Sequence, residues 1–151
     1  DAITLQRLAV FDMGYQGTAA ARASRAVFGD VIVLDSITVP TSAAPGETVM
    51  IDLNWHALAD LTTDYTLFVH LLDADGDLAA QVDTPPRGNT LPTSTWPPDY
   101  PLTDHVLLAL PERPGDYRLY LGWYDTITFD RLPVAGSLDG RLLIGEIHVE
   151  G

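Results

Sequence analysis

The stretch ETVMIDLNWH, residues 47–56, decides the fold class. Every second residue in it is apolar and suited to a buried position: Val49, Ile51, Leu53 and Trp55. Successive side chains of a β-strand point to opposite faces, so this spacing places the four residues together on one face. The stretch therefore predicts a strand that is buried on one side.

The same alternation recurs along the chain. It is found in DYTLFVHLL (64–72), DHVLLAL (104–110) and DYRLYLGWY (116–124), and residues 31–39 and 141–149 form further β-branched runs. Pro-Gly and Asp-Gly turn signals separate these runs, at APGET, DADGD, RPGDY and SLDGR. Few windows show a helical period. The pattern predicts an all-β, antiparallel β-sandwich of the immunoglobulin or fibronectin type, with about seven to nine strands.

The predicted domain covers residues 28–151. Residues 1–27 are expected to form an N-terminal extension, with a possible strand in AITLQRLAVF (2–11) followed by a glycine- and alanine-rich loop or linker.

Composition excludes several functional classes. The formal net charge is −13, so a nucleic-acid backbone would be repelled. No apolar run approaches the ~20 residues of a membrane span, so we expect no membrane insertion by this chain. The chain has no cysteine, which removes disulfides and thiolate metal sites.

The segment HLLDADGDLAAQ, residues 70–81, resembles a calcium-binding loop through Asp73, Asp75 and Asp77. An EF-hand counted from Asp73 would need glycine at its sixth position and an acid at its twelfth, where Leu78 and Thr84 stand. The apolar runs on either side favour a hairpin turn closed at Gly76. A calcium site of another type at the three aspartates is the weaker alternative.

Catalytic motifs are missing from the sequence. His56, His70, His105 and His148 show no metal-ligand spacing, and His56 and His70 are expected to share a solvent face of one sheet. There is no nucleophile elbow and no glycine-rich phosphate loop. We expect a non-catalytic protein without a cofactor. An enzyme that acts on glycosides is a further hypothesis. It would need two carboxyl groups that face each other across a cleft at roughly 5 to 9.5 Å.

The long loop TPPRGNTLPTSTWPPDYPLTD, residues 84–104, is the best candidate binding region. Its prolines exclude a central strand and a regular helix, and a loop of this length in a small domain is often functional. Trp96 and Tyr100 would stack on a sugar ring. The polar neighbours that would bind the same sugar are Arg87, Asn89 and Asp99. The alternative, which we favour, is that Trp96 folds back into the edge of the sandwich.

Two sets of motifs each carry a resemblance. PGETVMIDLNW followed by PGDYRLYLGWYD resembles immunoglobulin-like and fibronectin-like sandwiches, in which Tyr117 would occupy a tyrosine corner. The segments WHAL (55–58), 64–86, 91–104 and 114–134 together resemble a bacterial module at the extracytoplasmic C-terminal end of polytopic membrane proteins related to protein mannosyltransferases. That resemblance covers about Phe28 to the end and implies a setting outside the membrane, tethered through a membrane-embedded parent protein.

Two functions from different classes follow. The first is an accessory or recognition domain that binds a glycan. The second is a structural spacer or protein-interaction module without a small-molecule ligand. The exposure of Trp96 discriminates between them: an exposed indole favours glycan recognition, and a buried one favours the spacer.

Overall fold

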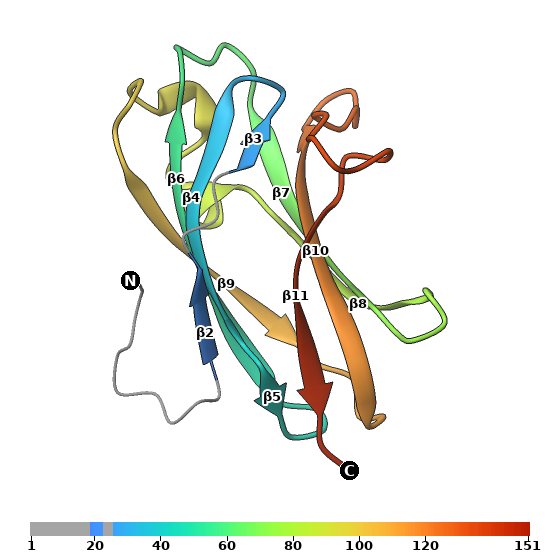
Figure 1. Cartoon of the computed structure of the whole chain (residues 1–151). Helices are drawn as coiled ribbons and strands as arrows, with labels where there is room; N and C mark the ends of the chain where they lie inside the picture. Colours follow the sequence, from blue (N-terminus) through green and yellow to red (C-terminus); the bar gives the residue numbers. More distant parts are fainter. Residues whose placement is uncertain (1–18, 23–25) are drawn as a thin grey trace.

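The structure, a computed structural model, describes residues 19–22 and 26–151 and consists of two facing sheets (Figure 1). The β10 sheet has the order β5-β11-β10-β7-β8, and the β6 sheet has the order β2-β4-β6-β9, with β3 also pairing with β4. The strands are β2 (Ala19–Arg22), β3 (Ala26–Phe28), β4 (Ile32–Pro40), β5 (Ser42–Ala43), β6 (Thr48–Ala57), β7 (Tyr65–Leu72), β8 (Leu78–Thr84), β9 (Leu102–Ala109), β10 (Gly115–Asp125) and β11 (Leu142–Val149).

The predicted all-β sandwich is confirmed. Seven of the described strands have seven or more residues (β4, β6, β7, β8, β9, β10 and β11). Six of them correspond to the alternating and β-branched runs of the sequence, and β8 is the apolar run that follows the turn at Gly76. The three short strands β2, β3 and β5 lie beside β4 and β11. All pairs of long strands are antiparallel, whereas β5 runs parallel to the end of β11.

The sandwich includes two short strands that come before the first strand predicted from the sequence. β2 and β3 lie mostly within the segment predicted as an extension, 1–27, and both pair with β4. The possible strand at 2–11 lies outside the described residues, and the domain boundary stays a prediction.

The core lies between the sheets and is centred on tryptophan. Trp55 of β6 and Trp123 of β10 meet edge to face with ring centroids 5.0 Å apart, and both are buried, as their strand positions predicted. Phe28 packs against Trp55 from the end of β3. These rings come from both sheets, so the two sheets share one continuous core.

The tyrosine corner is present. The Tyr117 hydroxyl donates a hydrogen bond of 2.6 Å to the carbonyl of Arg113, just before β10, and the side chain is buried. This contact fixes the entry of the chain into the penultimate strand, as in other immunoglobulin-like sandwiches.

Candidate functional site

The loop between β8 and β9 buries the residue that was expected to mark a binding site. Trp96 is only 3% exposed, and its Nε1 donates to the carbonyl of Leu91 at 2.9 Å. Its ring meets Trp123 edge to face, with centroids 5.9 Å apart. The favoured expectation that Trp96 folds back is confirmed, and the indole has no face open for stacking on a sugar.

The polar residues of the same loop serve mainly to shape it. Arg87 donates from its backbone N–H to Asp104 Oδ2 and from Nε to the carbonyl of Thr103, so it ties the short 3-10 helix η1 (Pro86–Asn89) to β9. Asn89 and Asp99 take positive φ values of 72° and 60°, which short polar side chains tolerate. A second 3-10 turn, η2 (Thr93–Thr95), precedes Trp96.

Tyr100 is the exception, with 58% of its surface exposed. The loop therefore presents one aromatic ring rather than the predicted pair.

The aspartate segment forms the predicted hairpin turn between β7 and β8. One carboxylate oxygen of Asp73 accepts hydrogen bonds from the backbone N–H groups of Asp75 and Asp77, at 2.9 and 3.0 Å, and Gly76 closes the turn with φ +85°. The carboxylates of the three aspartates do lie within 4.8 Å of one another. Because Asp73 stabilises the turn in this way, the turn alone explains its side chain, and the calcium alternative stays a prediction.

Three histidines form cross-strand pairs with aspartates on the outer faces of the sandwich. The Nδ1 atoms of His56, His105 and His148 lie 2.5 to 2.7 Å from carboxylate oxygens of Asp35, Asp52 and Asp116, respectively. The expectation that His56 and His70 share one face is wrong, because β6 and β7 belong to different sheets. Such pairs stabilise neighbouring strands and require no catalytic explanation.

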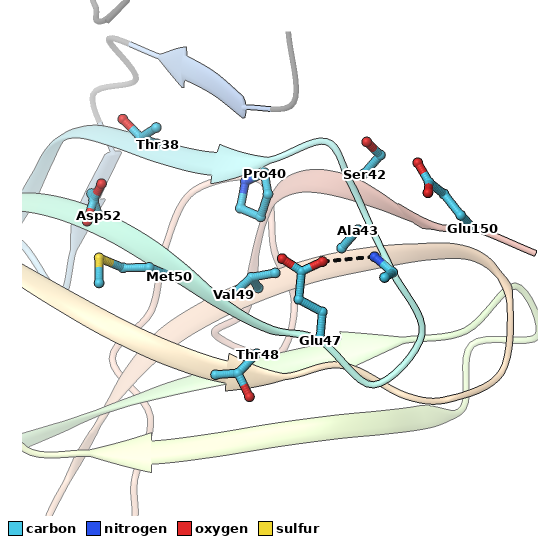
Figure 2. A pocket seen from close by; sticks show the side chains of 11 residues that line it. Thr38, Pro40, Ser42, Ala43, Glu47, Thr48, Val49, Met50, Asp52 and Glu150 are labelled. Carbon is cyan, nitrogen blue, oxygen red and sulfur yellow. Dashed lines mark hydrogen bonds between the residues drawn. The ribbon is translucent and has the colours of Figure 1, made fainter. Parts of the chain in front are cut away.

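The β6 sheet carries a hollow of about 470 Å³ near β5 (Figure 2). Three carboxylates line it, from Glu47, Asp52 and Glu150, together with threonine and serine hydroxyls. Glu47 accepts a hydrogen bond from the backbone N–H of Ala44 at 2.9 Å and so caps the turn that leads into β6. The hollow is open and acidic, so its charge disfavours an anionic ligand.

The outer face of the β10 sheet carries a group of arginine and aromatic side chains that sequence reasoning did not identify. We call it the arginine–aromatic face, and it consists of Phe68, His70, Tyr120, Tyr124, Arg131 and Arg141. The Arg131 guanidinium lies 4.6 Å from the centre of the Phe68 ring, and Arg141 lies 5.2 Å from that of Tyr120. Stacked guanidinium groups keep their N–H donors at the ring edge, available to a second partner.

The connection between β10 and β11, residues 126–141, lies over this face and is called the covering loop. Phe68 points away from the core but is only 2% exposed, because the loop and the neighbouring rings cover it. Gly122 stands opposite Phe68 in the register. A Cβ at Gly122 would lie 2.3 Å from the carbonyl oxygen of Gly140 and 2.5 Å from Phe68, so glycine is required for this packing.

Hydrogen bonds fasten the covering loop in its middle and near its C-terminal end. The Leu132 N–H donates to the carbonyl of Trp123, and the Gly29 N–H donates to the carbonyl of Pro133, both at 2.8 Å. Arg131 Nη1 donates to the carbonyl of Asp139, whose carboxylate pairs with Arg141 at 2.9 Å. The loop is thus an ordered part of the sandwich.

Two ionisable groups of the arginine–aromatic face have pKa values shifted from their ordinary ones. Burial, together with the positive charges of Arg131 and Arg141, lowers the pKa of His70 below its ordinary 6.5, so the imidazole is neutral at pH 7. Burial and the hydrogen bond that Tyr124 donates to Asp83 Oδ2 raise the pKa of the Tyr124 hydroxyl. The face therefore offers two guanidinium cations around a neutral imidazole.

Phe129, in the covering loop, combines exposure with an unfavourable backbone. It is 71% exposed and has φ 66°, a left-handed conformation that costs a residue with a Cβ roughly 1–2 kcal/mol. Asp125 holds it there, since its carbonyl accepts from the Phe129 N–H at 2.8 Å and its carboxylate accepts from Ile127 N–H. The Phe129 ring lies beside that of Tyr124, with centroids 5.8 Å apart, and takes no part in the core between the sheets.

The sequence carries only a faint signal for this group. The alternation in 64–72 and 116–124 puts Phe68, His70 and Tyr120 on the strand faces opposite the core residues, as the structure has them. It gives no sign that residues 126–141 pack over them. The glycine in LGWY, which interrupts a strand, is the one local hint that another segment packs closely there.

Comparison with known proteins supports the fold. No family model and no curated protein match the chain. Among solved structures, the C-terminal domain of Wzt has a TM-score of 0.59 at 14% identity, covering 91% of this chain and 81% of that domain. Together with the tyrosine corner, this likeness identifies the chain as an immunoglobulin-like β-sandwich module.

Two further structures are similar at a coarser level. The CARDB domain of a Pyrococcus furiosus protein has a TM-score of 0.45 at 11% identity, covering 76% of this chain and 88% of that chain. A β-glucuronidase of glycoside hydrolase family 2 has a TM-score of 0.47 at 7% identity, and the match covers 93% of this chain but 12% of the enzyme. Within the described residues, no helix is both long enough and apolar enough to cross a membrane.

Proposed function

We propose that this chain is a non-catalytic accessory module of a larger protein, which spaces or joins other domains and does not bind a small ligand. The observation that carries the proposal is the burial of Trp96 against Trp123, which removes the predicted stacking platform and leaves the long loop as part of the core. The strand edges and loops that remain exposed suit contact with other protein surfaces.

We further propose that the module lies outside the cytoplasmic membrane, tethered through a membrane-embedded parent protein of the glycosyltransferase-related kind. The support is the resemblance of its motifs, from WHAL to residues 114–134, to modules in that position. The test is a pair of fusions after Gly151 in the parent protein. We expect a fused alkaline phosphatase, which needs export, to be active and a fused green fluorescent protein to be dark; the reverse result would reject the setting.

Carbohydrate recognition is a second candidate, favoured by the arginine–aromatic face. Tyr120 and Tyr124 are half-buried there beside two guanidinium groups, an arrangement that can stack on a sugar ring and donate hydrogen bonds to its hydroxyls.

The two candidates are separated by calorimetric titration with a panel of oligosaccharides. The accessory role predicts no binding by the wild-type chain. If the wild type binds a sugar and Tyr124→Ala abolishes binding while Tyr100→Ala does not, the module recognises carbohydrate on the arginine–aromatic face and is not only a spacer. If Tyr100→Ala abolishes binding and Tyr124→Ala does not, the binding site lies on the loop between β8 and β9.

A further inference from the structure

An apolar groove of about 640 Å³ opens at one edge of the sandwich, beside β3. Its walls are β3, the turn at Gly29 and Asp30, residues 133–135 of the covering loop, and the start of β11. Val27, Val134 and Leu142 give it an apolar lining, and Leu143 at its rim is about half exposed. An open groove of this kind is able to receive an apolar side chain.

The covering loop also carries apolar side chains that point into solvent. Phe129 is 71% exposed, and Ile127 and Leu138 are more exposed still. Leu107, at 59%, is the next most exposed large apolar residue in the part of the chain that the structure describes. The three most exposed apolar side chains therefore all lie on the loop that forms one wall of the groove.

One charged residue lies near the protruding Phe129 ring, and one of opposite charge lies at the groove. Arg131, two residues after Phe129, has no carboxylate within salt-bridge distance among residues 26–151, although the chain carries a net charge of −13. Asp30, at the groove, is exposed and likewise has no cationic partner among these residues. A positive group thus accompanies the protruding ring, and a negative group accompanies the groove.

We propose that two copies of this chain form a two-fold symmetric dimer in which Phe129 of each copy enters the groove of the other. A two-fold interface needs a surface that is complementary to itself, so that a protrusion and a recess both occur on one copy. The covering loop supplies the protrusion and a wall of the recess, and Figure 1 shows it at the same end of the sandwich as β3. Arg131 of one copy then pairs with Asp30 of the other.

The dimer explains why the loop keeps a bulky residue in a left-handed conformation. The backbone at Phe129 would suit asparagine or glycine better, and within one copy its ring contacts only the edge of the arginine–aromatic face at Tyr124, with centroids 5.8 Å apart, and stays 71% exposed. An ordered, exposed aromatic beside an arginine is typical of the residues that contribute most to a protein interface. This inference goes beyond the accessory role, since it concerns self-association and holds whether or not the module also joins other domains.

The test is sedimentation of the 151-residue chain over a wide range of concentrations, at physiological salt, where the Debye length of about 8 Å screens the repulsion between two acidic copies. We expect a monomer–dimer equilibrium. Phe129→Asn removes the ring and its contact with Tyr124 but suits the left-handed backbone, so the monomer should stay folded, while the dissociation constant of the dimer rises at least about tenfold. Tyr100→Asn is the matched control, an exposed aromatic outside both surfaces, and should leave association unchanged.

A charge cycle tests the pairing itself. Arg131→Glu should weaken the dimer, because the new carboxylate of one copy would face Asp30 of the other. Adding Asp30→Asn should recover part of the loss, because it removes one of these two negative charges. Asparagine also suits the φ of 59° at position 30. A wild-type chain that stays monomeric, or a dimer that Phe129→Asn leaves intact, would overturn the proposal.

Discussion

At the residue scale, the packing around Phe68 shows how a single glycine permits a second buried cluster outside the core. The Phe68 ring lies between the His70 ring, the Tyr124 ring and the Arg131 guanidinium on the outer face of the β10 sheet. Its place depends on Gly122, directly opposite in the register. The residue is glycine because both the ring and the covering loop occupy the space of a side chain.

Replacing Gly122 with alanine should therefore destabilise the protein. The added methyl would overlap Phe68 and the Gly140 carbonyl, and overpacking of this kind typically costs about 1–3 kcal/mol. Urea unfolding measures the loss. As a control, Gly76→Asn adds a side chain where nothing lies within 4 Å and where asparagine tolerates the positive φ, so the free energy of unfolding should barely change.

His70 should make the protein less stable in mild acid. Burial and the two arginines lower its pKa in the folded state, so the unfolded chain binds the proton more readily. The contribution is complete above the ordinary pKa of 6.5 and is lost as the pH falls from there through the lowered value. Comparing the free energy of unfolding of wild type and His70→Gln across pH isolates this effect from the other histidines; equal pH slopes would contradict it.

At the element scale, strands and tight turns follow from local sequence, whereas the long loops do not. The alternating runs 47–56 and 116–124 form β6 and β10. When every second residue is apolar, only an extended strand with those residues facing the core buries all of them. The covering loop has no such period. Its contact with Phe68 depends on β7, a strand more than 50 residues earlier in the sequence, so no local pattern predicted the site it forms.

The β7–β8 hairpin should depend on Asp73 and not on calcium. Asp73→Ala removes the acceptor of two backbone hydrogen bonds and should lower the free energy of unfolding by about 1 kcal/mol. Thermal unfolding with calcium chloride or with a chelator should give the same midpoint for the wild type. A midpoint that rises with calcium in the wild type but not in Asp73→Ala would establish the metal site instead.

The loop between β8 and β9 should depend on Trp96 as an anchor. Trp96→Ala deletes a buried ring and its hydrogen bond to Leu91, so the free energy of unfolding should fall by roughly 3–5 kcal/mol. Tyr100→Ala, in the same loop but exposed, should change it by less than about 0.5 kcal/mol. Urea titration of both variants distinguishes an anchor from an exposed binding residue, and comparable losses would refute the assignment.

At the scale of the whole molecule, one core joins the two sheets. Trp55 lies on the β6 sheet, Trp123 lies on the β10 sheet, and Trp96 reaches the same cluster from a loop. The strand pattern predicted the first two as core residues. Proline-rich segments give no periodicity from which burial can be judged, so burial of the third was favoured only because apolar surface prefers burial. The sandwich as a class was therefore predictable, and the strand order and the arginine–aromatic face were not.

Unfolding should then be cooperative. Tryptophan fluorescence reports on the shared core and far-ultraviolet circular dichroism on both sheets, and the two urea transitions should coincide. A fluorescence change at lower urea than the loss of strand signal would mean that the sheets separate before they unfold.

The parallel pairing of β5 with β11 has a mechanical consequence. The N–H groups of His148 and Glu150 donate to the carbonyls of Thr41 and Ala43, so the last strand is held on this side as well as by β10. Tension pulling on Gly151 along β11 acts across these bonds, which must break together in shear, whereas a hairpin pulled from its open end peels one bond at a time. The sandwich is thus built to bear load through its final strand.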